Sequence, residues 1–203
     1  MTLKGIDVSQ YQGVIDWSKV SKAGIQFAIV RASLGQTTRD STFASNVAGA
    51  QKNGLAVGAY HYSYAENVAQ AQAEAKNFLA AVKDQRLTYP LVYDLENNTN
   101  TTKNFGTWSD LAVTFLRTLE SAGYFAMLYS NKYSLETIYD AAKIAPFAVW
   151  IAQWAPKCTY QGPYGIWQTT DSGKVAGVTG AVDADISYVD YAAIIRHAGL
   201  NHL

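Results

Sequence analysis

Apolar runs of strand length alternate with helix-forming stretches along the first three quarters of the chain. The runs at 27–33 and 147–154 are almost continuously apolar, which is typical of strands covered on both faces. The stretch 66–83 is rich in Ala, with Glu and Lys, and predicts a helix. The same pattern predicts strands at 3–9, 27–33, 55–64, 89–96, 124–130 and 147–154, and helices at 16–23, 40–53, 66–83, 107–121 and 133–141.

The spacing of the elements changes after residue 154. The segments 164–170 and 181–187 predict two more strands, but only about ten residues separate each from the strand before it. A crossover between parallel strands needs a dozen or more residues. We therefore expect loops instead of helices here, with room for one antiparallel strand. The tail at 188–198 predicts a helix that closes the barrel or packs against it.

Eight strands with about five connecting helices predict an α/β fold, an irregular and shortened TIM-like β/α barrel in which three strands joined by loops follow about five β/α units. A regular barrel takes about 250 residues, and this chain has 203, so some helices must be missing. An open doubly wound sheet is the alternative. Against it, no glycine-rich phosphate loop follows the first strand. Residues 1–203 contain no repeat or linker, so we expect a single domain.

Composition excludes several classes of protein. Sixteen basic residues balance sixteen acidic ones, so the basic footprint of a nucleic-acid-binding protein is missing. No apolar stretch is long enough to span a bilayer. The N-terminus lacks the apolar core of a secretory signal, so we expect either synthesis in the cytoplasm or a trimmed sequence. The one cysteine, Cys158, excludes an intramolecular disulfide framework. Nothing in the sequence demands a dimer, so we expect a monomer.

Acidic residues gather where the predicted strands end. Asp7 ends the first strand, Asp94 and Glu96 end the fourth, and Asp183 and Asp185 lie in the last. Active groups of barrel enzymes lie at the carboxyl ends of strands. Residues two apart on a strand point to the same side, so Asp94 and Glu96 share a face, with Cα atoms roughly 6–7 Å apart.

Two acids on one face suit a particular chemistry. When they are close, one carboxylate stays ionised and its charge raises the pKa of the other. Glycoside hydrolysis uses such a pair, because one group must protonate the leaving oxygen while an anion supports positive charge at the sugar carbon. The alternative for Asp94 and Glu96 is a strand end in water with two solvated acids.

A second alternative is a metal-dependent hydrolase. Oxygen-preferring cations such as Mg²⁺ or Ca²⁺ could be held by Asp7, Asp94, Glu96 and Asp183. Zinc is disfavoured because histidine, a common zinc ligand, is scarce, with three in the whole chain. Our expectation is that the protein needs neither a metal nor another cofactor.

Six segments together resemble a known family. GIDVSQYQGVIDW (5–17), YHYSY (60–64), YPLVYDLE (89–96), LYSN (128–131), VWIAQW (149–154) and WQTTDSGKVAGVTGAVDADIS (167–187) occur in this order. The set resembles the family 25 glycoside hydrolases, the Chalaropsis-type muramidases of phage endolysins and bacterial autolysins. The resemblance implies an irregular barrel that cleaves the β-1,4 bond between N-acetylmuramic acid and N-acetylglucosamine in peptidoglycan. It also implies action on the cell wall after release from the cytoplasm.

The resemblance also implies roles for individual residues. Glu96 would be the general acid, and Asp94 would orient the 2-acetamido group of the substrate or stabilise charge. Asp7 and Asp183 would complete an acidic floor. The candidates for binding the glycan are Tyr62, Tyr129, Gln153, Trp154 and Trp167, four of which are strand-end aromatics able to stack on sugar rings. Either the acetamido group or a carboxylate such as Asp183 could attack the anomeric carbon.

The chain departs from the family pattern in two ways. Its last motif is VDAD where the family more often has VDLN, so Asp185 either shifts the pKa values of the site or faces solvent. Endolysins of this type usually carry a wall-binding module, and we expect no separate one within residues 1–203. A non-catalytic peptidoglycan-binding barrel is a further alternative, and the intact acids count against it.

Two residues near the predicted site are expected to be structural. His61 alternates with Tyr62 and should lie on the outer face of its strand if Tyr62 points inward. Arg31 and Asp40 are expected to pair behind the site, in preference to a contact between Arg31 and substrate.

Overall fold

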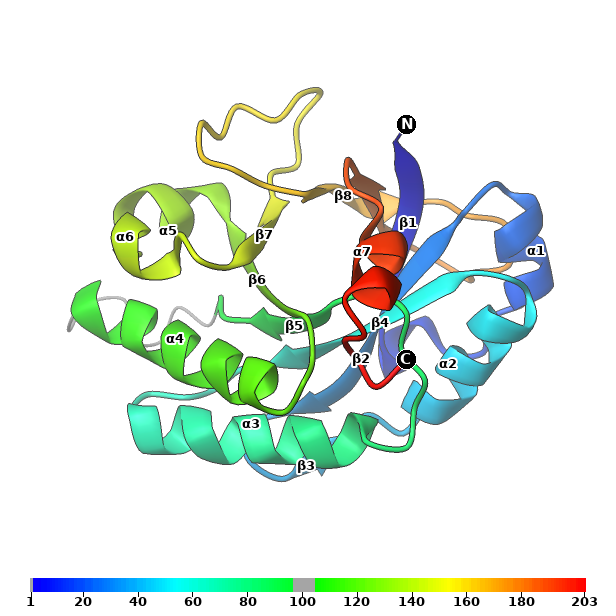
Figure 1. Cartoon of the computed structure of the whole chain (residues 1–203). Coiled ribbons are helices and arrows are strands. Elements are labelled where there is room, and N and C mark those ends of the chain that lie inside the picture. The colour runs from blue at the N-terminus through cyan, green and yellow to red at the C-terminus, as the bar shows by residue number, and fades with distance from the viewer. Residues whose placement is uncertain (1, 97–104) are drawn as a thin grey trace.

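Eight strands close into a barrel in the computed structural model, which describes residues 2–96 and 105–203 (Figure 1). The barrel strands are β1 (Leu3–Val8), β2 (Phe27–Leu34), β4 (Ala56–Tyr62), β5 (Leu91–Asp94), β6 (Ala126–Asn131), β7 (Ala148–Ala152), β8 (Ile166–Gly173) and β9 (Val182–Ser187). A two-residue strand, β3 (Thr38–Arg39), pairs with β2 outside the barrel and was not predicted. The irregular TIM-like α/β barrel predicted from the sequence is confirmed.

Helices cover the outside of the barrel. They are α1 (Trp17–Lys22), α2 (Phe43–Lys52), α3 (Val68–Val82), α4 (Phe105–Ser121), α5 (Lys132–Thr137), α6 (Ala141–Ile144) and α7 (Tyr191–His197), with a 3-10 turn, η1 (Gln10–Gln12), after β1. The single helix predicted at 133–141 is wrong, because Asp140 caps a second short helix by accepting a hydrogen bond from Ala142 N at 2.9 Å. Within the described ranges, every helix is too short or too polar to cross a membrane.

The last strand runs against its neighbours. β1, β2 and β4 to β8 are parallel in their pairings around the barrel, whereas β9 is antiparallel to both β8 and β1. The amino end of β9 therefore lies at the rim where the other strands end. As a result, Asp183 near the start of β9 is directly opposite Asp7 near the end of β1.

Strand alternation divides the apolar residues into two cores. On β5, Val92 points into the barrel together with Phe27 and Trp150. Leu91 and Tyr93 point outward and pack with residues of the covering helices. This is the alternation expected for a strand, and it gives the barrel a packed inner layer beneath the rim.

The C-terminal segment closes the amino end of the barrel. Residues of α7 pack with Phe27 and Tyr89 of the inner core, and α7 lies across the barrel in Figure 1. The buried Asn201 side chain donates hydrogen bonds to the carbonyls of Leu87 and Tyr89, both at 3.0 Å, and accepts one from Phe125 N at 2.8 Å. The helix predicted at 188–198 does pack against the barrel.

Asn201→Ala should destabilise the protein by about 2–3 kcal/mol, because it leaves buried backbone groups without partners. Alanine also fits poorly at the backbone angle φ of 57° found there. Urea unfolding measures the change. Asn53→Ala removes one half-exposed hydrogen bond to Gly49 O and is the control, with an expected loss below about 1 kcal/mol. Equal losses for the two variants would contradict a closing role for the tail.

Candidate active site

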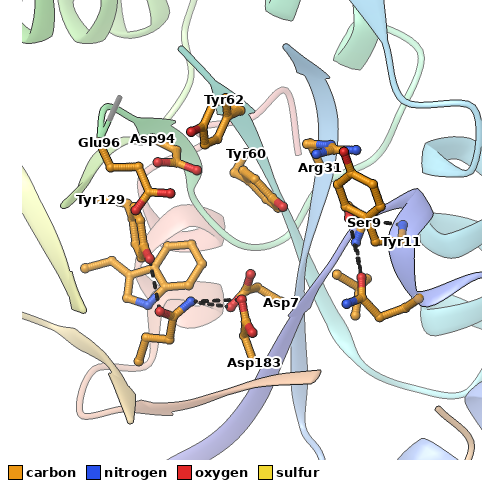
Figure 2. Close-up of a pocket in the computed structure, with 14 residues that line it drawn as sticks. Asp7, Ser9, Tyr11, Arg31, Tyr60, Tyr62, Asp94, Glu96, Tyr129 and Asp183 are labelled. Carbon is orange, nitrogen blue, oxygen red and sulfur yellow. Dashed lines mark hydrogen bonds between the residues drawn. The ribbon is translucent and has the colours of Figure 1, made fainter. Parts of the chain in front are cut away.

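A cavity of about 200 Å³ opens at the carboxyl end of the barrel (Figure 2). Each of the eight barrel strands contributes at least one residue to its wall. The lining residues are Asp7, Val8, Ser9, Tyr11, Gln12, Arg31, Tyr60, Tyr62, Asp94, Glu96, Tyr129, Trp150, Gln168 and Asp183. All four predicted catalytic acids are therefore brought together in one cavity.

The two acids of the D-x-E motif lie side by side. Asp94 is the last residue of β5 and is 6% exposed, while Glu96 follows just beyond the strand and is partly exposed. Figure 2 shows both carboxyl groups on one side of the cavity, near Tyr62 and Tyr129. Leu95 between them is buried in the outer core. The predicted sharing of one face by Asp94 and Glu96 is confirmed.

Burial is the main influence on the charge of this pair. It raises the pKa of Asp94 well above the usual value, the charge of Glu96 raises it further, and the Arg31 guanidinium opposes the rise. Burial also raises the pKa of Glu96, followed by the charge of Asp183. The sequence argument named mutual repulsion as the cause. Repulsion does contribute, but removal from water contributes more.

Asp7 and Asp183 form the opposite side of the cavity and are held by one amide. Gln168 on β8 donates through Nε2 to Asp7 Oδ2 at 2.8 Å and to Asp183 Oδ2 at 3.4 Å. Its Oε1 accepts hydrogen bonds from Tyr129 Oη and Trp154 Nε1, both at 3.0 Å. Gln168 thus fixes the two floor acids relative to the aromatic wall.

Asp185 does not face solvent, so that alternative is wrong. The side chain is 3% exposed, and Oδ1 accepts a hydrogen bond from Trp150 Nε1 at 2.9 Å. It lies two residues after Asp183 on the same inward face of β9 and therefore deeper in the barrel. Burial raises the pKa of Asp7 well above its ordinary value, and Asp185 raises it further when Asp185 is ionised.

The predicted glycan-binding residues separate into two groups. Tyr62 and Tyr129 line the cavity. Trp154 is 58% exposed and lines an adjoining cavity of about 240 Å³ that it shares with Tyr129 and Glu96. The first group therefore surrounds the acid pair on the side of β4, β6 and β7.

Gln153 and Trp167 form the second group and do not line the cavity. Trp167 is packed in the outer core and donates through Nε1 to Gln153 O at 2.8 Å. The Gln153 side chain is bonded instead to Thr159. Alternation explains the placement, because Gln168 points inward and the preceding residue on β8 must point outward.

Sequence reasoning missed several lining residues. Tyr60 and Trp150 share the inward phase of Tyr62 and Tyr129, and that phase was the signal that could have identified them. The expected pair of Arg31 and Asp40 is present, with Nε and Oδ2 2.9 Å apart. Arg31 nevertheless also lines the cavity, which the expectation did not include.

His61 lies in the wall behind the site, as expected. It is buried among outer-core aromatics, and its Nδ1 is 2.8 Å from Ser33 Oγ. Burial lowers its pKa, so the ring is neutral at pH 7 and its 3.4 Å approach to Glu74 is not an ion pair. Glu74 in turn accepts hydrogen bonds from Ser63 Oγ and Tyr64 N, which fixes the loop that follows Tyr62.

The acids are arranged around the rim and not about one point. Among the residues that the structure describes, no three His, Cys, Asp or Glu side chains form a group that could hold a metal ion. The arrangement therefore gives no support to the alternative of a metal-dependent hydrolase.

Comparison with known proteins identifies the family. The sequence model of glycosyl hydrolases family 25 matches residues 6–178. Lysozyme M1 of Streptomyces globisporus is 33% identical over 201 residues, which are 89% of this chain and 66% of that protein. The bacterial lysozyme from Streptomyces coelicolor superimposes with a TM-score of 0.83 at 26% identity, over 97% of this chain and 96% of that one.

A third relative was solved with a ligand. The modular autolysin LytC from Streptococcus pneumoniae, in complex with a synthetic peptidoglycan ligand, has a TM-score of 0.83 at 29% identity. The match covers 92% of this chain but 47% of LytC, so this chain spans about half the length of that relative. On the extent of the family match and the shared barrel, the chain belongs to family 25 of the glycosyl hydrolases.

Proposed function

We propose that this chain hydrolyses the β-1,4 bond between N-acetylmuramic acid and N-acetylglucosamine in bacterial cell-wall peptidoglycan. The observation that carries the proposal is the placement of Glu96 and Asp94 on one side of a cavity at the rim of a family 25 barrel. Relatives named lysozyme, and LytC with its synthetic peptidoglycan ligand, support the choice of substrate. Action as a monomer at the cell wall, after release from the cytoplasm, is part of the proposal.

Glu96 is the proposed general acid. A group with this role must keep its proton near the working pH and reach the leaving oxygen. Burial and the charge of Asp183 raise the pKa of Glu96, and the side chain is partly exposed where two cavities meet. Those conditions match a carboxylic acid that protonates the glycosidic oxygen as the C–O bond breaks.

Asp94 is the proposed partner of the substrate's 2-acetamido group. Its Oδ1 is buried and has no hydrogen-bond partner among the described residues. An acetamido N–H would supply the missing donor. The acetamido oxygen would then attack the anomeric carbon while the leaving oxygen takes the Glu96 proton, and water would open the resulting ring with Glu96 as base. Asp94 would act by orienting the nucleophile.

The aromatic wall is the proposed binding surface for the sugar rings. Tyr62 and Tyr129 line the first cavity, and Trp154 presents an exposed ring beside the second. An aromatic face packs against sugar C–H bonds while its polar edge makes a hydrogen bond. Two adjoining cavities that meet at Glu96 and Tyr129 would place one sugar on each side of the cleaved bond.

Glu96→Gln should reduce release of reducing ends from peptidoglycan by about 10²–10⁴-fold, because the amide cannot donate the acid's proton. Mass spectrometry of the borohydride-reduced digest should show fragments that end in reduced muramic acid. Glu120→Gln, at the far end of α4, is the matched control and should digest at the wild-type rate. Normal lysis by the Glu96 variant, or loss of activity in a strong chelator, would overturn the proposal.

Asp94→Asn should lower kcat by about 10²–10³-fold, since an amide orients the acetamido N–H less well than a carboxylate. The wild-type enzyme should also cleave an N-trifluoroacetyl aryl glycoside more slowly than the N-acetyl compound with the same leaving group, because fluorine weakens the attacking oxygen. Equal rates for the two glycosides would instead indicate direct attack by a carboxylate such as Asp183.

A further inference from the structure

Strand β9 carries two acids that point into the barrel at different depths. Asp183 lies opposite Asp7 of β1 at the rim. Asp185 lies one step deeper, opposite Gly5 of β1 on one side and Gln168 of β8 on the other. Because Gly5 has no side chain, the neighbouring acid on β1 that Asp185 can meet is Asp7.

The two oxygens of Asp185 have different surroundings. Oδ1 accepts a hydrogen bond from Trp150 Nε1 at 2.9 Å. Oδ2 is buried, and no donor faces it within the described part of the chain. A buried carboxylate oxygen without a donor is costly, whereas a protonated oxygen becomes a donor itself. Asp7 is the diagonal neighbour of Asp185 across the β1–β9 pair, and its carboxylate can accept that proton.

Among the residues that the structure describes, the groups around Asp185 offer no positive charge to balance it. Asp7 on β1 is one of these groups. The others, which face Asp185 or Asp7, are Tyr60 on β4, Tyr89 before β5, Asp94 on β5, Trp150 on β7, Gln168 on β8 and Asp183 on β9. Arg31 is the cation among the described residues that line the cavity, and it is bonded to Asp40. If Asp7, Asp183 and Asp185 were all ionised, these neighbouring carboxylates would therefore repel one another.

We propose that Asp185 is a carboxylic acid in the native protein that donates its hydrogen to Asp7, and that it thereby positions Asp7 as a singly charged floor of the groove. Asp7 then receives donors from two sides, from Asp185 below and from Gln168 Nε2 at 2.8 Å. Asp185 touches no substrate in this scheme and is a positioning residue. The catalytic consequence rests on the proposed function, but the protonation of Asp185 does not.

Two variants test whether residue 185 acts as a hydrogen-bond donor to Asp7 or only fills space in the barrel. Asp185→Asn keeps an oxygen for Trp150 Nε1 and supplies an N–H to Asp7. Asp185→Ala supplies neither. The acid limb of kcat/KM on solubilised peptidoglycan should stay near its wild-type position in the Asn variant. In the Ala variant it should move to higher pH by about one unit, because buried Asp7 has lost a donor.

The pH dependence of thermal stability tests the proton without substrate. Burial raises the pKa of Asp185 well above its ordinary 3.8, so its contribution to stability is full below 3.8 and is lost as the pH rises through the folded-state value. An asparagine at position 185 does not titrate, so its contribution to stability does not fall as the pH rises. The Tm of Asp185→Asn minus that of the wild type should therefore become more positive from pH 3.5 towards about pH 7.

Asp190→Asn is the matched control. It removes an acid from the same segment, and the new residue can still cap α7, so its Tm difference should show no such rise. A Tm difference for Asp185→Asn that falls with pH would mean that Asp185 is ionised in the native state and would overturn the proposal. An acid limb displaced equally by Asn and Ala would overturn the positioning role. Failure of every variant and the wild type to release muramic-acid ends would count against the proposed function alone.

Discussion

The site is governed by an excess of buried carboxyl groups over positive charges. Five acids point into the carboxyl end of this barrel, and the Arg31 guanidinium in the cavity wall is already bonded to Asp40. Removing an ion from water costs several kcal/mol even after relaxation, against a net stability of about 5–15 kcal/mol for a typical domain. Full ionisation would therefore cost a large share of that stability, and we expect some of the acids to keep their protons. On this argument the cavity contains carboxylic acids as well as ionised carboxylates.

The fold compensates for this cost on the other face of the same strands. Outward-pointing residues of β5 pack under α4, where Tyr93 stacks on Phe115 with ring centroids 4.0 Å apart. The C-terminal tail adds a second closure at the opposite end of the barrel. Alternation sends adjacent residues of a strand to opposite faces. The outward-pointing side chains can therefore stabilise the fold while the inward-pointing side chains of the same strand form the site.

The same alternation explains which parts of the site the sequence could predict. In YPLVYDLE the apolar residues Leu91, Tyr93 and Leu95 define one face, so the phase of Asp94 and Glu96 follows directly. On β8 an aromatic residue and an amide are adjacent, and either Trp167 or Gln168 could have pointed inward. Pairing with β7 and β9 decides that Gln168 does. Local pattern therefore predicts phase only where one face is clearly apolar.

Apolar runs and connection lengths predicted some features of the fold and not others. The order of strands and helices, and the room for an antiparallel strand, follow from apolar runs and connection lengths. The two-residue strand β3, the break between α5 and α6, and the depth of Asp185 do not. The position of Asp185 requires β9 to run against β1 in one particular register, because a shift of one residue would turn its side chain outward.

The buried oxygen of Asp94 that has no hydrogen-bond partner relates the cost of burial to the proposed binding of substrate. In the free protein, Asp94 Oδ1 is buried without a partner among the described residues, while the loop beside it is held rigidly through Glu74. A rigid wall prevents the site from relaxing around its own unpaired oxygen, so the free energy is recovered only when a ligand supplies a donor. A sugar with an N–H at the right position gains that interaction and one without it does not. Under the proposed function, the cost of this unpaired oxygen would become selectivity for an acetamido sugar.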